Sequence, residues 1–214
     1  MKKVVHTFCK ETTDASRNLI SAHALVSKVI PCENSSELLN DAEILIAHPK
    51  DISLHLNKLH NLKWMHSSYS GMDGLFKSKQ WVNYVIEKQP TYPITRTSYS
   101  ESIVTFVLGA VFSCLLFRSP VFINVGRSTV IDEKSLITAL DNKWISAALL
   151  DVFDEEPLPP ASPFWEHPGI FVTPHIGGIT GQVNAPVVGD FLSNLENFVD
   201  GKPLTFLANY NKEY

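Results

Sequence analysis

Short runs of β-branched and aromatic residues alternate with helical patterns along the first hundred residues. This alternation is typical of an α/β fold with a mainly parallel sheet. Apolar residues at helical spacing predict helices over Ala15–Lys28 and Ile52–Leu59. The runs predict four strands: Lys3–Phe8, Glu43–His48, Leu62–Ser67 and Tyr92–Arg96.

The longest apolar segment extends from Ser102 to Phe117, between Glu101 and Arg118, and we predict that it forms a helix that ends near Arg118. Ser98 and Glu101 have the spacing of a capping box, which predicts a helix start. Apolar residues lie on nearly every side of this helix, so we expect it to be covered all round. The apolar segment Ser102–Phe117 is shorter than the roughly 20 apolar residues that span a bilayer, so no membrane partner is expected. We predict a homodimer formed through this helix.

The pattern after Pro120 is that of a βαβ unit with one further strand and helix. We predict strands at Val121–Val125, Ile145–Val152 and Ile170–Pro174, and helices at Glu133–Asp141 and about Thr180–Val199.

The composition indicates which classes of fold and binding partner to expect. The chain has 214 residues, of which 44% are hydrophobic and 19% charged, enough for an ordinary core. A net charge of -4 with scattered Lys and Arg argues against a nucleic-acid partner. Three widely spaced cysteines without a Cys-x-x-Cys pair predict neither a disulfide framework nor a metal site. With no signal-peptide core in the first residues, we expect a cytoplasmic protein.

Three polar residues follow the three predicted C-terminal strands at equal spacing: Arg127, Asp151 and His175. Parallel strands end at one edge of a sheet, where ligands bind in open α/β folds. Glu156 lies in the adjoining Pro-rich loop, within reach of His175. We therefore expect these side chains to lie in one crevice.

Together these side chains suit the reduction of a carbonyl next to a carboxylate. An arginine fork holds a planar carboxylate in two parallel hydrogen bonds. A histidine exchanges a proton near neutral pH, and a nearby carboxylate favours its protonated form. Taken singly, each of these residues is more often structural, and their joint placement at successive strand ends gives the functional interpretation equal weight.

Four segments resemble signature segments of the D-isomer-specific 2-hydroxyacid dehydrogenases: "SSYSGMDGL", "INVGRSTVID", "AALLDVFDEEPLP" and "FWEHPGIFVTPHIGG". The Pro-rich part is most similar to the glyoxylate/hydroxypyruvate reductase branch. The resemblance implies two Rossmann- or flavodoxin-like parallel-sheet domains. It also implies hydride transfer between NAD(P)H and a small 2-oxo acid or D-2-hydroxy acid.

The resemblance also implies roles for individual residues. Arg127 would bind the substrate carboxylate and carbonyl, His175 would be the general acid/base, and Glu156 would be its partner. Asp151 would lie by the nicotinamide carboxamide. Other residues on the cofactor's path would be Val125, Gly126, Arg127, His175, Ile176, Gly177 and Gly178. The substrate pocket would be formed by Ser70 and Gly71, through their amides, and by Met72 and Trp165.

The chain departs from this family in two respects. Ser128 stands where the family usually has Gly, which leaves Arg127 in place, and the greater departure is an absence. The family binds NAD or NADP through a Gly-x-Gly-x-x-Gly turn, and no Gly-x-Gly occurs in this sequence. The family places that turn between the long helix and the strand that begins at Val121. About 100 residues, several βαβ units, would be missing between positions 120 and 121.

We therefore expect a substrate domain over residues 1–97, with the tail from about 181–214 packing back on it. Residues 98–180 would be what remains of the dinucleotide-binding domain. Three hypotheses stay open: an enzyme whose sequence here lacks an internal segment, an internally deleted non-enzymatic relative that binds small carboxylates or only dimerises, and a plain α/β carboxylate-binding module.

Overall fold

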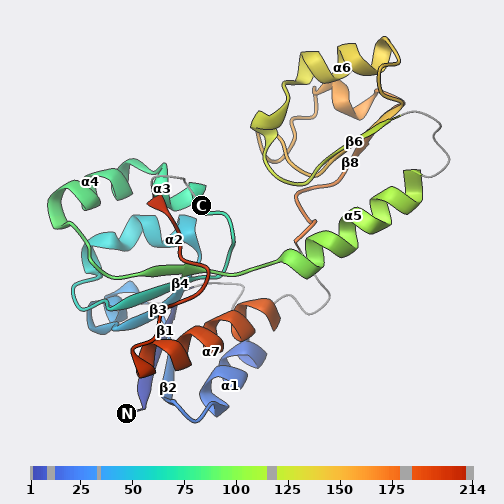
Figure 1. Ribbon diagram of the computed structural model, residues 1–214. Coiled ribbons are helices and arrows are strands. Elements are labelled where there is room, and N and C mark those ends of the chain that lie inside the picture. Colours follow the sequence, from blue (N-terminus) through green and yellow to red (C-terminus); the bar gives the residue numbers. More distant parts are fainter. Residues whose placement is uncertain (1, 9–12, 33–34, 115–119, 179–184, 211–214) are drawn as a thin grey trace. The chain divides into compact units, whose positions relative to one another are not determined.

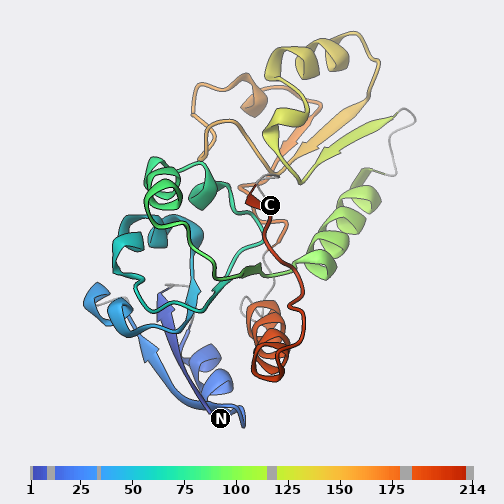
Figure 2. The same cartoon turned by 60° about the vertical axis from the view of Figure 1, so that its left-hand side comes forward.

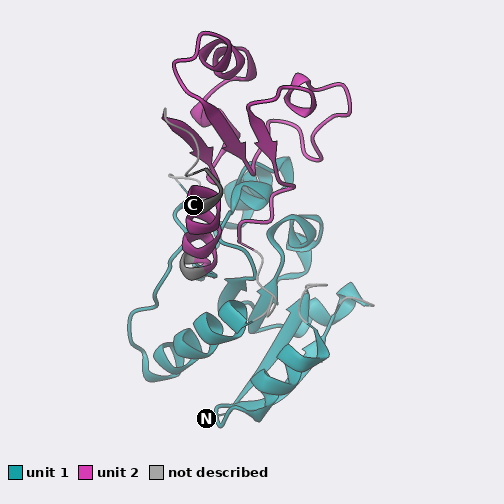
Figure 3. Cartoon of the chain, turned by 90° about the vertical axis from the view of Figure 1, so that its right-hand side faces the viewer, with its two compact units in different colours: residues 1–98, 182–214 teal, residues 99–181 magenta. Residues whose placement is uncertain are grey.

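The computed structural model describes residues 2–8, 13–32, 35–114, 120–178 and 185–210 (Figure 1). The chain forms two compact units, residues 1–98 with 182–214 and residues 99–181 (Figure 3). Both units contain a parallel sheet, which confirms the predicted α/β class. In the described part of the chain, no helix has the length and apolarity needed to cross a membrane.

The first unit is built on a five-stranded parallel sheet of order β2-β1-β3-β4-β5. Ala47 pairs with Ser67, and Ser67 pairs with Arg96, so three strands end at one edge of the sheet. The loop that follows Ser67 therefore starts at the carboxyl edge. The strands are β1 (Lys3–Phe8), β2 (Val26–Pro31), β3 (Ile44–Ala47), β4 (Trp64–Ser67) and β5 (Ile94–Arg96).

Helices cover both faces of this sheet (Figure 1). On one face α7 stacks Phe191 on Trp64, with the ring centroids 5.0 Å apart. On the other face a buried cluster includes Leu45, Met65 and Trp81. The α-helices are α1 (Asp14–Ala22), α2 (Pro49–Ile52), α3 (Asp73–Phe76), α4 (Lys79–Lys88) and α7 (Ala185–Asp200), and the 3₁₀-helices are η1 (Ser36–Asp41) and η2 (Ser53–Lys58).

The second unit has a three-stranded parallel sheet of order β6-β7-β8 (Figure 2). Leu136 and Leu140 of α6 are buried against Ala148, Phe153 and Phe164. The strands are β6 (Val121–Asn124), β7 (Ala147–Leu150) and β8 (Ile170–Val172). The helices are α5 (Ser100–Cys114), η3 (Ser128–Val130), α6 (Glu133–Asp141) and η4 (Pro163–Trp165).

The predicted helix Ala15–Lys28 is wrong in its second half. Helix α1 is capped by Thr13, whose side chain accepts from the Ser16 amide, and it ends at Ala22. The residues after it form β2, which the prediction missed. Valines and isoleucine in β2 pair with β1, and this pairing outweighs the helical spacing read from the sequence.

Two further elements differ from prediction. The predicted helix Ile52–Leu59 is divided into α2, which begins at Pro49, and the 3₁₀-helix η2. Helices α3 and α4 lie in a stretch for which no helix was predicted. The predicted end of the long helix at Arg118 and the predicted helix start at Thr180 lie outside the described residues.

The long helix α5 begins at Ser100 rather than at Ser98. The Ser98 amide instead donates to the Asp190 carboxylate at 2.6 Å. Val104, Leu108 and Val111 are exposed, contrary to the expectation of all-round cover. Their spacing puts them on one face of the helix, so this face is an apolar stripe.

Candidate functional site

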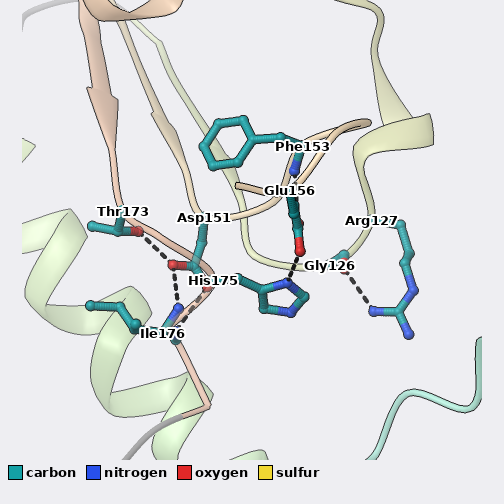
Figure 4. Close-up of polar contacts among 9 residues, drawn as sticks. Gly126, Arg127, Asp151, Phe153, Glu156, Thr173, His175 and Ile176 are labelled. Atoms are coloured by element: carbon teal, nitrogen blue, oxygen red, sulfur yellow. Dashed lines mark hydrogen bonds and ion pairs between the residues drawn. The ribbon is translucent and has the colours of Figure 1, made fainter. Parts of the chain in front are cut away.

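His175 follows strand β8 and is held in an unusual backbone conformation. Its φ angle is 54°, in the left-handed region that residues other than glycine rarely adopt. Its amide donates to the Thr173 carbonyl at 3.0 Å. The imidazole Nδ1 lies 2.8 Å from Glu156 Oε2 (Figure 4). The turn thus presents the ring to a carboxylate from a different loop.

Glu156 fixes the ring through two contacts of its carboxylate. While Oε2 contacts the imidazole, Oε1 accepts from the Phe153 amide at 3.1 Å. The side chains of His175 and Glu156 are 52% and 37% exposed, so the pair adds little to stability. The contact with Nδ1 leaves Nε2 as the ring atom that can exchange a proton with a bound molecule. The arrangement is therefore suited to acid–base chemistry.

Asp151 closes strand β7 and is only 2% exposed. Its carboxylate accepts from Thr173 Oγ1 at 2.5 Å and from the amides of Ile176 and Gly177 at 2.9 and 2.8 Å. These three donors lie on both sides of His175 in the sequence. Asp151 therefore holds the turn that presents the imidazole.

Gly177 is required by this close packing. A Cβ atom built at Gly177 would lie 2.9 Å from Asp151 Oδ2 and 3.4 Å from the Phe106 ring. The distance to Asp151 Oδ2 is shorter than a van der Waals contact allows, so a larger side chain would push the carboxylate away from the turn.

Arg127 lies at the same edge of the sheet, in the turn after β6. The Asn124 side chain holds this turn, because it accepts from the Gly126 amide at 3.1 Å and donates to the Arg127 carbonyl at 2.8 Å. Arg127 Nη1 donates to the Gly126 carbonyl at 2.9 Å. Figure 4 shows the exposed guanidinium apart from the His175 ring.

The predicted cofactor residues occupy these same two turns. Val125 and Gly126 follow β6, and Ile176, Gly177 and Gly178 follow His175. The predicted role of Asp151 next to the nicotinamide stays a prediction, and its two oxygens already serve the turn. Sequence reasoning missed Thr173 and Asn124, whose hydrogen bonds shape the turns. Both are polar residues at strand ends, which is the signal that could have found them.

The predicted substrate residues fall in both units. Ser70 and Gly71 are partly exposed in the loop after β4. Met72 is fully buried in the core of the first unit, so the prediction that it lines a substrate pocket does not fit its position. Trp165 is exposed at the end of η4, where its ring N–H donates to the Pro159 carbonyl at 3.0 Å.

Comparison with known sequences gives matches over part of the chain. Residues 115–177 match the family model of the D-isomer specific 2-hydroxyacid dehydrogenase NAD binding domain. Glyoxylate/hydroxypyruvate reductase B of Citrobacter koseri is 33% identical over 134 residues, which is 63% of this chain. The matched part spans 38% of that relative's length.

Two solved structures share the fold. A D-isomer specific 2-hydroxyacid dehydrogenase family protein from Aeromonas salmonicida has a TM-score of 0.79 at 18% identity, covering 98% of this chain and 100% of its own. A D-isomer specific 2-hydroxyacid dehydrogenase from Xanthobacter autotrophicus, in complex with NADPH and MES, has a TM-score of 0.78 at 17% identity. That match covers 100% of both chains.

Proposed function

We propose that the chain is a member of the D-isomer specific 2-hydroxyacid dehydrogenase family, and that it takes part in hydride transfer between a nicotinamide cofactor and a small 2-oxo acid. The similarity to a glyoxylate/hydroxypyruvate reductase supports glyoxylate or hydroxypyruvate as the substrate. The 2.8 Å contact between His175 and Glu156 is the observation that carries this proposal.

In the proposed reaction His175 is the proton donor. The reduced cofactor, NADH or NADPH, would supply the hydride to the carbonyl carbon when bound. As the carbonyl double bond opens, its electron pair moves to oxygen, and His175 Nε2 releases its proton there to form the hydroxyl. The Glu156 carboxylate contacts Nδ1 and so orients the ring for this step. In the reverse direction His175 takes the proton back.

Arg127 is the proposed carboxylate-binding residue. Its guanidinium carries a permanent charge and can bind a planar carboxylate through two parallel hydrogen bonds. In the first unit, Ser70 and Gly71 are proposed to bind a substrate carboxylate through backbone amides. Trp165 is proposed to line the pocket.

The residues present fit one end of a dinucleotide and not the other. The turns after β6 and β8 bring Gly126, Gly177 and Gly178 beside the proton donor. The amides of Gly126 and Gly177 are already bound within these turns. For the cofactor phosphates, the sequence has no Gly-x-Gly turn. We therefore assign proton transfer and substrate binding to this chain and assign no residue to the phosphates.

This missing turn favours a second candidate function, an internally deleted relative that binds small carboxylates without catalysis. A titration of the purified chain with NADPH and with NADH, followed by cofactor fluorescence, separates the two functions. Saturable binding together with consumption of cofactor on addition of glyoxylate supports the reductase. Binding of neither cofactor supports the non-enzymatic relative.

We propose further that the chain forms a homodimer through α5. The stripe of Val104, Leu108 and Val111 exposes apolar side chains that a second copy of the helix can cover. We expect light scattering to give twice the mass of one chain, and Leu108→Glu to give the mass of one. Leu19→Glu changes another exposed leucine, in α1, and should leave the dimer intact. A monomeric unmodified chain would overturn this proposal.

A further inference from the structure

A chain of hydrogen bonds runs through the interior of the first unit, beneath the loop that follows β4. Trp64 Nε1 donates to Thr95 Oγ1 at 2.9 Å, and Thr95 Oγ1 lies 2.8 Å from His66 Nδ1. His66 Nε2 lies 3.3 Å from Thr97 Oγ1, which donates to the Ser67 carbonyl at 2.8 Å. All five residues are fully buried. We call this chain the His66 relay.

Hydrogen counting fixes the direction of the relay. The Thr97 hydroxyl has one hydrogen, which it donates to the Ser67 carbonyl, so it accepts from His66 Nε2–H. Nδ1 of the neutral ring is then an acceptor, and the Thr95 hydroxyl donates to it. Each donor and acceptor in the relay is used, which is what burial of polar groups requires.

The surroundings of His66 keep its ring neutral. Trp64 and Phe191 pack their rings against it, with centroids 6.2 and 5.7 Å away. Burial lowers the pKa of His66 from 6.5 to about 3. A neutral ring donates from one nitrogen and accepts at the other, which the relay needs, whereas an imidazolium could only donate.

The relay ends on the residue from which the loop starts. The Ser67 carbonyl accepts from the Thr97 amide at 3.2 Å as well as from the Thr97 hydroxyl. The Ser67 hydroxyl donates to the Tyr69 carbonyl at 2.7 Å and accepts from the Tyr69 amide at 3.0 Å. On the other side, the Ser68 amide donates to the Ala47 carbonyl at 3.1 Å. The first residues of the loop are thus anchored to both neighbouring strands.

We propose that His66 and Thr97 are positioning residues that hold the loop carrying Ser70 and Gly71 in the form that binds a substrate carboxylate. This inference rests on the proposed function, in which that loop contacts the carboxylate. Apolar side chains could fill the same volume without buried polar groups that need partners. The relay ends at the residue from which this loop starts. Its buried polar groups are therefore explained if they fix the position of the loop.

The test compares two buried threonines of the first unit, Thr7 in β1 and Thr97 directly after β5. Thr97→Val removes the relay hydroxyl with little change in volume, whereas Thr97→Ser keeps it. Thr7→Val is the matched control, because Thr7 is also fully buried and its hydroxyl accepts from Arg17 Nε, away from the loop. We expect Thr97→Val to shift the amide resonances of Tyr69, Ser70 and Gly71, and Thr97→Ser to restore them. Thr7→Val should leave these resonances unchanged.

Kinetics on the unmodified chain and its variants add a second readout. With glyoxylate, Thr97→Val should raise KM about tenfold, the effect of one lost hydrogen bond, and leave kcat within about twofold. If Thr97→Val changes the loop resonances and KM no more than Thr7→Val does, the inference is overturned. If the unmodified chain has no turnover, the proposed function fails, while the amide resonances still decide whether the relay positions the loop.

A third measurement needs no variant and covers the case in which Thr97→Val does not fold. The ¹⁵N spectrum of the His66 ring in the unmodified chain reports its tautomer. A protonated Nε2 with an unprotonated Nδ1 supports the relay. A ring protonated at Nδ1 would overturn it, because the Thr97 hydroxyl would then face a nitrogen to which it has no hydrogen left to donate.

Discussion

The two units each place a histidine near the carboxyl end of a strand and treat it in opposite ways. His66 of the first unit is fully buried between two threonine hydroxyls, and burial lowers its pKa to about 3. His175 of the second unit is half-exposed and contacts a carboxylate. The same side chain is thus a neutral structural connector in one unit and a group open to proton exchange in the other. The surroundings decide which role a histidine takes.

The sheets that carry the two histidines also differ in how completely they bury polar groups. Five strands covered on both faces can bury a polar relay completely, and the first unit does so. The second unit has three short strands, and its turns expose the groups proposed for chemistry. The comparison predicts that variants of the two histidines affect different properties, activity in one case and stability in the other.

The largest expected effect is on turnover. His175→Ala should lower kcat/KM for glyoxylate by about 100-fold or more, because proton transfer is lost. The melting temperature should change little, since the side chain is half-exposed and its ion pair contributes little to stability. The rate of cofactor consumption gives kcat/KM, and thermal unfolding gives the melting temperature. Equal losses of stability in His175→Ala and in a His66 variant would remove the contrast between the two sites.

The next effect is an acid sensitivity of the first unit. Because the pKa of His66 is about 3 in the fold and near 6.5 when unfolded, the unfolded chain binds the extra proton between these pH values. The free energy of unfolding should therefore fall as the pH drops below 6.5, by up to about 1.4 kcal/mol per pH unit. Above 6.5 the contribution of His66 is fully present.

His66→Gln tests this sensitivity, because glutamine can keep a donor toward Thr97 and does not titrate. Between pH 7.5 and 5, His66→Gln should lose about 2 kcal/mol less stability than the unmodified chain. Urea unfolding followed by tryptophan fluorescence gives the values. Replacing Trp144 and Trp165 with Phe in both proteins leaves Trp64 and Trp81, both of the first unit, as reporters. Parallel pH profiles would contradict the assignment.

A smaller effect is expected at the turn that holds His175. Gly177→Ala places a methyl group 2.9 Å from an Asp151 oxygen that is held by hydrogen bonds. We expect about 1–3 kcal/mol of destabilisation of the second unit and faster exchange of the Ile176 amide. Gly109→Ala is the control, since a Cβ there meets nothing within 4 Å. Unchanged exchange in Gly177→Ala would mean that Asp151 does not hold the turn.

The smallest effect is expected at Glu156. Glu156→Gln keeps an oxygen for the ring and loses the charge, which should cost about 1 kcal/mol of transition-state stabilisation, or about fivefold in kcat/KM. Steady-state kinetics measure this difference. A loss as large as that of His175→Ala would show that Glu156 does more than orient and charge the ring.

Local pattern was enough to predict part of this molecule. Strand β1 and helix α6 have the predicted bounds, because a β-branched run and a capped helical period determine them locally. Strand β2 was missed because its valines and isoleucine also fit a helical face, and only pairing with β1 decides between the two. Helices α3 and α4 follow a glycine-containing loop, in which periodicity is short.

The candidate site and the His66 relay likewise include features that the sequence predicts and features that it does not. Strand order predicts that Glu156 and His175 come close, and the structure places them in contact, whereas their catalytic roles stay predictions. The His66 relay could not be predicted, because its members come from two strands about 30 residues apart and their hydrogen bonds depend on register. Met72 was assigned to a pocket from its place in a motif, and its burial is set by packing that the motif does not describe.

The end groups of the His66 relay determine what it can transmit. The Trp64 indole has a hydrogen to give and no lone pair to accept one, and the Ser67 carbonyl accepts and has no hydrogen to give. No proton can enter at one end or leave at the other, so the relay is not a proton wire. Its hydrogen bonds have one possible polarity, which makes it a rigid brace with no alternative arrangement to switch into.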